Sequence, residues 1–249
     1  MIKIKSSREI KLMKQANKIV AETHNFLKEK IKPGISTLEI DQLGEKFIKN
    51  KGAKPSFKGY RGYPASVCTS INEEVVHGIP DKNRILKNGD IISLDIGAIY
   101  KGFNGDAART LAVGEINDRA AKLIEVTRKS FYEGIKNAVA GNRLTDISHA
   151  IQKYVESNSF SVVRKYVGHG IGSSMHEDPQ IPNFGPPGRG PRLKAGMTLA
   201  IEPMVNIGGY EVETLDDGWT VVTKDRTLSS HYENTILIKK EEPELLSVV

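Results

Sequence analysis

Apolar residues recur at helical spacing in two separate stretches of the chain, each broken by glycine. The first stretch predicts a helix over residues 7–30 and a second helix after Ser36, which can form a capping box with Glu39. The second stretch predicts a helix from Asn117 to about residue 139 and another from Thr145 to about residue 157. The pattern therefore indicates two pairs of amphipathic helices.

Runs of β-branched and apolar residues, separated by turn residues, predict strands between and after these helices. The predicted strands cover residues 66–71, 90–100, 106–113, 161–167, 198–201, 219–223 and 231–238. The second and third strands flank the turn 101–105 and should form a hairpin. Residues 179–191 hold five prolines and three glycines, so we predict a loop there.

The order of elements repeats along the chain at a constant offset of 107 residues, the distance from Gly34 to Gly141. Residues 34–40 align with 141–147 at this offset, and the block beginning at Leu86 aligns with the block beginning at Leu193. An offset shared by two separate blocks indicates an internal duplication. Asp95 then falls on Glu202.

The pattern predicts an α+β fold in which residues 1–249 form a single domain made of two similar halves, about 1–114 and 115–249. A pseudo-twofold axis would relate the halves. Helices would cover the outer face of a curved antiparallel sheet and leave its other face free for a site. A doubly wound parallel sheet fits less well, because the later strands are too close in sequence for helical crossovers.

Composition is that of an ordinary globular protein, with 39% hydrophobic and 27% charged residues. No apolar run approaches the roughly 18 residues of a membrane span, and the first residues lead into a charged helix instead of a signal core. The single cysteine, Cys68, excludes an internal disulfide. We therefore expect a cytoplasmic protein with no membrane association.

The net charge of +6 has two interpretations. Attraction to nucleic acid or to the ribosome would call for clustered basic residues, preferably interleaved with aromatic ones. The basic residues of this chain are scattered, which favours a mildly basic surface that keeps the protein soluble. Transient ribosome association stays open as the second interpretation.

Two acidic residues occupy equivalent positions of the repeat inside apolar strands, Asp95 and Glu202. Burial of a carboxylate is costly unless it is paired, protonated or bound to a metal. Asp106 begins the strand after the turn and can share a face with Asp95, while Glu233 belongs to the last strand. One such acid alone would be read as solvent-exposed, but the equivalent pair favours a metal site.

A histidine stands among glycines in the segment from Gly168 to Gly172, at the end of a predicted strand, and His176 follows seven residues after His169. The glycines permit the close backbone approach that a packed site needs. Carboxylates with one imidazole suit Mn²⁺, Fe²⁺, Co²⁺ or Zn²⁺, and acids can bridge two ions. A structural zinc site is excluded because one cysteine cannot build it.

Together, the glycine-flanked His169, His176 and the spacing of the four acids resemble the type I methionine aminopeptidases, in the bacterial form without an N-terminal extension. The resemblance spans essentially the whole chain and includes Val75–Pro80, Asp95–Gly97, Gly105–Asp106, Ile201–Met204 and Tyr232–Thr235. The duplicated "pita-bread" fold of this family agrees with the internal repeat.

The resemblance implies a single catalytic domain with two divalent metal ions, cobalt, manganese, iron or zinc. It assigns the metal ligands to Asp95, Asp106, His169, Glu202 and Glu233. Asp106 and Glu233 would bridge the ions, Asp95 would bind one of them, and His169 with Glu202 would bind the other.

The resemblance also implies the reaction: metal-activated water attacks the first peptide bond and removes the N-terminal methionine when the second residue is small. Glu202 would shuttle the proton, His176 would donate to the scissile carbonyl, and His77 would contact the next amide. The partners would be nascent polypeptide N-termini, met by a monomeric enzyme.

The methionine pocket should be apolar and narrow, because a flexible thioether packs well against aromatic rings and sulfur. The resemblance assigns it to Tyr60, Tyr63, Cys68 and Trp219, with Phe57 and Met175 as further walls. Ordinary core packing is the alternative interpretation of these side chains.

Three other functions compete with this one. An Xaa-Pro aminopeptidase or prolidase typically carries an additional N-terminal domain, whereas the first repeat here begins almost at Met1. A binding protein of the same fold would have lost metal ligands, and all five are present. A dimetal phosphatase or nuclease would need phosphate contacts such as a glycine-rich loop with its lysine, and none is found.

Overall fold

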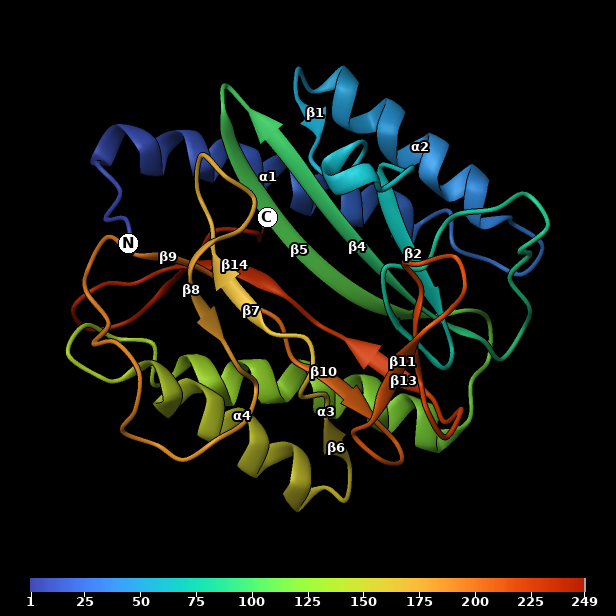
Figure 1. Cartoon of the computed structure of the whole chain (residues 1–249). Helices are drawn as coiled ribbons and strands as arrows, with labels where there is room; N and C mark the ends of the chain where they lie inside the picture. Colours follow the sequence, from blue (N-terminus) through green and yellow to red (C-terminus); the bar gives the residue numbers. More distant parts are fainter. Residues whose placement is uncertain (249) are drawn as a thin grey trace.

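Two pairs of helices lie on opposite sides of the strands in this computed structural model, which describes residues 1–248 (Figure 1). The helices are α1 (Ser7–Lys28), α2 (Thr37–Asn50), the 3-10 helix η1 (Tyr60–Gly62), α3 (Asp118–Ile135) and α4 (Leu144–Ser157). The four predicted α-helices are confirmed, although α1 and α3 end before the predicted residues 30 and 139.

Side chains at the helix starts take up backbone N–H groups that have no partner within the helix. The predicted capping box of α2 is present: Ser36 Oγ accepts from the N–H of Glu39, whose carboxylate accepts from the N–H of Ser36. Asn117 caps α3 as predicted, since its side chain accepts from the N–H of Ala120. Both helices therefore begin where these local signals predict.

The predicted cap of α4 is wrong, because the N-cap residue is Arg143 and Thr145 lies inside the first turn. The Thr145 hydroxyl is engaged by the neighbouring loop, where it accepts from the N–H of Arg189 at 2.8 Å. Asp146 instead accepts from the N–H of Arg143 at 2.8 Å. A tertiary contact therefore moves the helix start two residues earlier.

The first sheet is built around a long hairpin. Its strands are β1 (Lys54–Pro55), β2 (Val67–Ile71), β4 (Ile91–Tyr100) and β5 (Phe103–Ala112), with β4 paired to the other three. The predicted turn over 101–105 is too long: Lys101 and Gly102 alone form it, both at positive φ, as in a type I′ hairpin. Asp106 consequently lies inside β5 instead of at its start.

A second sheet holds the order β15-β14-β9-β7-β8. Its strands are β7 (Gly168–Gly170), β8 (Glu177–Ile181), β9 (Thr198–Ile201), β14 (Asn234–Leu237) and β15 (Glu244–Leu245). The loop predicted from residue 179 is wrong in its first residues, because Pro179 belongs to β8. That strand lies at the edge of the sheet, where a residue without an N–H is tolerated.

Two three-stranded sheets complete the fold, in the orders β13-β10-β6 and β11-β12-β3. Their strands are β3 (Glu74–Val76), β6 (Ser161–Val162), β10 (Met204–Asn206), β11 (Val212–Thr214), β12 (Val221–Thr223) and β13 (Ser229–His231). The strand predicted over 161–167 is thus cut to its first two residues, and the strand predicted over 219–223 begins at Val221. His169, predicted to lie at the end of a strand, is the middle residue of the short strand β7.

The strand predicted over 231–238 is divided into β13 and β14, with Tyr232 and Glu233 in the break. A matching break separates β9 from β10 at Glu202 and Pro203. The antiparallel register is the same on both sides of the breaks, with Asn234 opposite Ile201 and Met204 opposite His231. Glu202 therefore lies opposite Glu233.

Each helix pair closes its own hydrophobic core. One core joins α1 and α2 to the inner residues of β2, β4 and β5, including Leu94 and Ile96. The other joins α3 and α4 to β6, β8, β9, β10 and β14, with Phe131 fully buried at its centre. The faces of the strands that do not meet helices are left for the residues described below. Within residues 1–248, no helix is long and apolar enough to cross a membrane.

We predict that Gly105→Ala destabilises the protein, because α1 packs directly on β5 at this residue. A Cβ at residue 105 would lie 2.6 Å from the backbone nitrogen of Asn17 and 2.7 Å from the carbonyl carbon of Ala16. Moving the helix to relieve this contact should lower the free energy of unfolding by about 1–3 kcal/mol, measured by urea denaturation.

Gly209→Ala is the control, because the nearest atom to its Cβ is a movable carboxylate oxygen of Glu211 at 2.8 Å. An equal loss of stability in the two variants would show that close packing of α1 on β5 is not the cause.

Candidate metal centre

A cavity of about 350 Å³ opens between the two cores. Every site residue predicted from the sequence lines it: Phe57, Tyr60, Tyr63, Cys68, His77, Asp95, Asp106, His169, Met175, His176, Glu202, Trp219 and Glu233. The residues come from segments far apart in the chain, so their convergence is a property of the tertiary fold.

Asp95 and Asp106 reach the cavity from the two strands of the hairpin. Asp106 is paired with Gly97, and Gly97 is two residues from Asp95 on β4. Side chains two residues apart on a strand share a face, so both carboxylates project to the same side of the sheet. The alternate residues Ile96 and Ala107 face the α1 and α2 core, which is why a one-residue shift of register would destroy the pair.

Glu202 and Glu233 reach the cavity from the two opposed strand breaks. Glu233 is fixed through its backbone: its N–H donates to the carbonyl of Ala108 at 2.9 Å, and its own carbonyl accepts from Arg109. The Arg109 guanidinium also donates to Asn234 Oδ1 at 2.6 Å and lies 4.5 Å from the ring centre of Tyr232. These bonds tie the Glu233 segment to the strand that carries Asp106.

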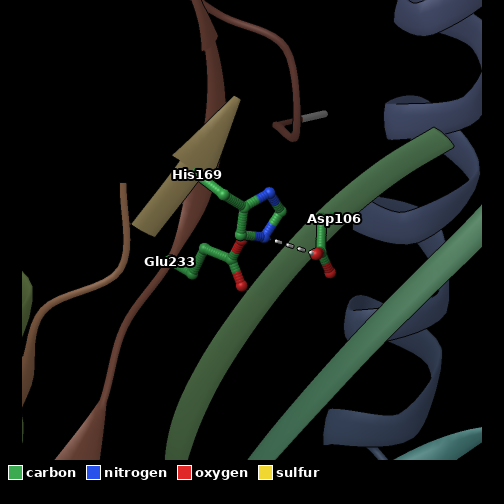
Figure 2. A group of neighbouring side chains, drawn as sticks. All are labelled: Asp106, His169 and Glu233. Atoms are coloured by element: carbon green, nitrogen blue, oxygen red, sulfur yellow. Dashed lines mark ion pairs between the residues drawn. The ribbon is translucent and has the colours of Figure 1, made fainter. Parts of the chain in front are cut away.

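His169 is held in a defined tautomer. Its Nδ1 lies 2.9 Å from the carbonyl oxygen of Gly170, to which it can only donate, so the proton is on Nδ1 and the lone pair is on Nε2. Nε2 lies 3.8 Å from Asp106 Oδ2, the approach marked in Figure 2, and 3.6 Å from Glu202 Oε1. Burial lowers the pKa of His169 to about 3, so the ring is a neutral ligand-type base.

Glycine beside His169 is required by the narrow space between β8 and β9. A Cβ at Gly170 would lie 2.7 Å from the carbonyl carbon of Asp178 on β8. The interpretation of these glycines as positions of close backbone approach is therefore correct at this residue.

The four carboxyl groups share a strongly unfavourable environment. Burial raises the pKa of Asp95 to about 7, despite the opposing effect of the Asp106 side chain. Burial and then the neighbouring Asp95 raise the pKa of Asp106 and of Glu202, and burial followed by Asp106 raises that of Glu233. Without a compensating cation, these groups favour the protonated state.

The donor set fits a divalent metal ion. The side chains of Asp106, His169 and Glu233, drawn in Figure 2, offer ligand atoms that all lie within 4.8 Å of one another. Asp95 Oδ1, Asp106 Oδ1 and Glu233 Oε1 are buried and have no hydrogen-bond partner. Buried carboxylate oxygens without donors are costly, and coordination to a cation would satisfy them.

Two further histidines line the cavity beside this cluster. His77 adopts a positive φ of 62°, a strained backbone typical of functional loops, and burial lowers its pKa to about 4. His176 lies with its ring centre 4.2 Å from that of His169. Desolvation in the cavity and then the charge of Arg61 lower the pKa of His176, so both rings are neutral at pH 7.

The predicted methionine pocket is one apolar cluster. Phe57, Tyr63, Cys68 and Met175 are buried together, and Tyr60 and Trp219 pack against them. Cys68 on β2 is paired with Asp95 on β4, so the apolar wall lies directly beside the acidic cluster. The Trp219 ring stands edge-on to Tyr63, with ring centres 5.1 Å apart.

Several contributors were not predicted from the sequence. Tyr166 and Gln180 line the cavity, and the Tyr166 ring stands edge-on to His77 at 5.7 Å. His231 is buried with its Nε2 3.8 Å from Glu202 Oε2, and Asn183 donates to the Glu202 carbonyl. His231 could have been noticed, because it stands two residues before Glu233 in the sequence.

Comparisons with known proteins agree along the whole chain. A model of metallopeptidase family M24 matches residues 11–240. A methionine aminopeptidase of Clostridium acetobutylicum is 61% identical over 248 residues, covering 100% of this chain and 99% of that protein. Methionine aminopeptidase 1 of Bacillus subtilis is 58% identical over 249 residues, covering 100% of both chains.

The backbone is similar to that of a crystal structure of methionine aminopeptidase from Thermotoga maritima, with a TM-score of 0.99, 48% identity and 100% coverage of both chains. These similarities confirm the family resemblance and the α+β "pita-bread" fold expected from the sequence.

We predict that the metal-free protein loses thermal stability as the pH rises from 7 to 8.5. A carboxyl group whose pKa is raised in the folded state loses its stabilising contribution as the pH rises from its unfolded pKa, about 4, to its folded pKa. For Asp95, whose folded pKa is about 7, this loss is nearly complete at pH 7, so the dependence above pH 7 comes from Asp106, Glu202 and Glu233, whose pKa values burial raises well above the ordinary range. For each proton that the folded state binds and the unfolded state does not, the free energy of unfolding falls by about 1.4 kcal/mol per unit increase in pH. Histidines add nothing in this range, because their unfolded pKa is about 6.5.

The melting temperature is measured as a function of pH in the presence of a chelator and again with excess Mn²⁺. Mn²⁺ should make the melting temperature depend less on pH. Glu202→Gln should make the slope of the metal-free protein shallower. A melting temperature that is constant or increases over this range without metal would contradict the assigned charge state.

Proposed function

The chain belongs to metallopeptidase family M24, and on that premise we propose that it removes the N-terminal methionine from peptides and nascent proteins whose second residue is small. One observation supports the proposal above others: a single cavity is lined both by four acids with a neutral imidazole and by an apolar wall of aromatic and sulfur-containing side chains. The first set suits a metal-dependent hydrolase, and the second suits a methionine side chain.

The metal would be held by Asp95, Asp106, His169, Glu202 and Glu233, as two divalent ions chosen from cobalt, manganese, iron and zinc. Divalent ions at such a site make water more nucleophilic at neutral pH and polarise a carbonyl oxygen. Asp106, His169 and Glu233 would form the centre of this ligand set, since their ligand atoms lie within 4.8 Å of one another.

The side chains of the cavity have complementary roles in hydrolysis. The substrate methionine enters the apolar cluster around Tyr63 and Cys68. Glu202 takes a proton from the attacking water and transfers it to the nitrogen of the departing amine as the peptide bond breaks. His176 donates a hydrogen bond to the scissile carbonyl as negative charge develops on its oxygen, and His77 contacts the amide of the second residue.

Further properties belong to the same proposal. We propose residues 1–249 as one catalytic unit whose halves, about 1–114 and 115–249, each supply metal ligands. The protein would act in the cytoplasm as a monomer on nascent N-termini. Transient ribosome association would rest on the mildly basic surface, in keeping with a net charge of +6.

The central prediction is that the protein releases methionine from a Met-Ala-Ser peptide when supplied with Mn²⁺, Fe²⁺, Co²⁺ or Zn²⁺. Glu202→Ala should lower kcat by about 10²- to 10⁴-fold, the usual range for a lost general acid–base, and His169→Ala should weaken metal binding as well. His149→Ala is the matched control, because His149 contacts the Gly185 carbonyl and does not line the cavity.

An Ala-Pro peptide in the same assay separates this function from that of an Xaa-Pro peptidase. Cleavage of the Ala-Pro peptide without cleavage of Met-Ala-Ser would overturn the proposal.

A second prediction concerns the residue after methionine. Peptides with Gly, Ala or Ser in this position should be cleaved, and those with Lys or Leu should not, because His77, Tyr166 and Trp219 pack closely where that residue would lie. Each excess methylene should cost about 10- to 200-fold in kcat/KM. Comparable kcat/KM values for Met-Ala and Met-Leu peptides would contradict the assignment.

A further inference from the structure

Tyr60 makes one polar contact that a pocket wall does not need. Its hydroxyl lies 2.8 Å from Nδ1 of His176, and the two rings are stacked with centres 5.3 Å apart and planes inclined by 28°. The contact joins η1 to the segment before β8, across 116 residues of sequence. It therefore ties a residue of the apolar pocket to a ring of the proposed catalytic group.

The Tyr60 ring is held in place by its own turn. Its N–H donates to the carbonyl of Phe57 at 2.8 Å, and its carbonyl accepts from the N–H of Tyr63 at 3.0 Å. The Arg61 guanidinium lies 5.5 Å from the ring centre, which favours the observed ring orientation. These bonds fix the backbone of the turn, and the Tyr60 ring packs against the apolar cluster of the pocket, which limits its rotation.

The direction of this hydrogen bond decides what His176 can do. A neutral imidazole carries one N–H, on either Nδ1 or Nε2. If Tyr60 donates to Nδ1, the imidazole proton is on Nε2, which is then a donor. If Nδ1 donates to Tyr60, Nε2 is a bare acceptor that repels a carbonyl oxygen. A phenol is a good donor and an imidazole nitrogen a good acceptor, so the first arrangement is favoured.

We propose that Tyr60 is a positioning residue: its hydroxyl donates to Nδ1 of His176 and thereby keeps the imidazole proton on Nε2, so that the Nε2–H donates a hydrogen bond to the scissile carbonyl. The inference rests on the proposed function and assigns to Tyr60 a role beyond that of a wall. His176 is exposed and Tyr60 is half-buried, so a bound peptide that excludes water strengthens the bond during the reaction.

The test is Tyr60→Phe, which keeps the ring that packs in the pocket and removes only the hydroxyl. One neutral hydrogen bond should shift the tautomer ratio by about two- to tenfold. We expect kcat on Met-Ala-Ser to fall by that factor while KM stays nearly constant. If Tyr60 only lined the pocket, Tyr60→Phe would leave kcat unchanged, and any effect would be on KM.

Nitrogen NMR of the zinc-loaded protein gives an observation that does not depend on activity. In the wild type, His176 should show protonated Nε2 and bare Nδ1. Tyr60→Phe should increase the Nδ1–H population. Tyr63→Phe removes a hydroxyl from the same pocket, but its partner is the Gly78 carbonyl, so the His176 signals should be unchanged. A wild-type His176 protonated on Nδ1 would overturn the proposal without any variant.

A double-mutant cycle checks that Tyr60 acts through His176. His176→Ala alone should lower kcat by about 10²- to 10³-fold, the usual cost of a lost oxyanion donor. Adding Tyr60→Phe to that variant should cause no further loss. If Tyr60→Phe lowered kcat as much in the His176→Ala variant as in the wild type, Tyr60 would act independently of His176, which would overturn the proposal. Failure of the wild type to release methionine would instead overturn the proposed function itself.

Discussion

Repulsion among four buried carboxyl groups is the constraint on which the rest of the structure depends. Asp95, Asp106, Glu202 and Glu233 converge on one cavity, and burial raises the pKa of each of them, while nearby carboxylates raise those of Asp106, Glu202 and Glu233 further. Such a cluster opposes folding unless protons or cations compensate it. The surrounding structure therefore has to hold these carboxyl groups in place. Their unfavourable arrangement suits them to act as metal ligands.

The supports come from sheet register and from hydrogen bonds to the backbone. A hairpin of fixed register puts Asp95 and Asp106 on one face, and two opposed strand breaks put Glu202 across from Glu233. Arg109 then bonds the carbonyl of Glu233 to the strand that carries Asp106. None of these supports requires a charge to approach the carboxylates directly, which leaves their oxygens free for a cation.

The same cavity joins two kinds of chemistry because its lining comes from segments far apart in the chain. The acidic side holds buried carboxylate oxygens without donors, whereas the other wall is an apolar cluster whose Cys68, on β2, is paired with Asp95 on β4. Neutral histidines line the same cavity. His169 is fixed as a lone-pair donor by the Gly170 carbonyl, and His176 contacts Tyr60 through its Nδ1. A substrate with an apolar side chain beside a peptide bond fits this division of the cavity.

Local sequence signals predict the helix pairs and the hairpin, because caps, periodicity and turns act over a few residues. The repeat aligns Asp95 with Glu202, and the family resemblance assigns the other site residues, which stay predictions although the fold brings them to one cavity. Only the tertiary structure decided where the last strand breaks, where α4 begins, and that Pro179 lies in an edge strand. It alone brought in Arg109, Tyr166 and His231. These features depend on contacts between segments far apart in the chain, and local propensity carries no information about such contacts.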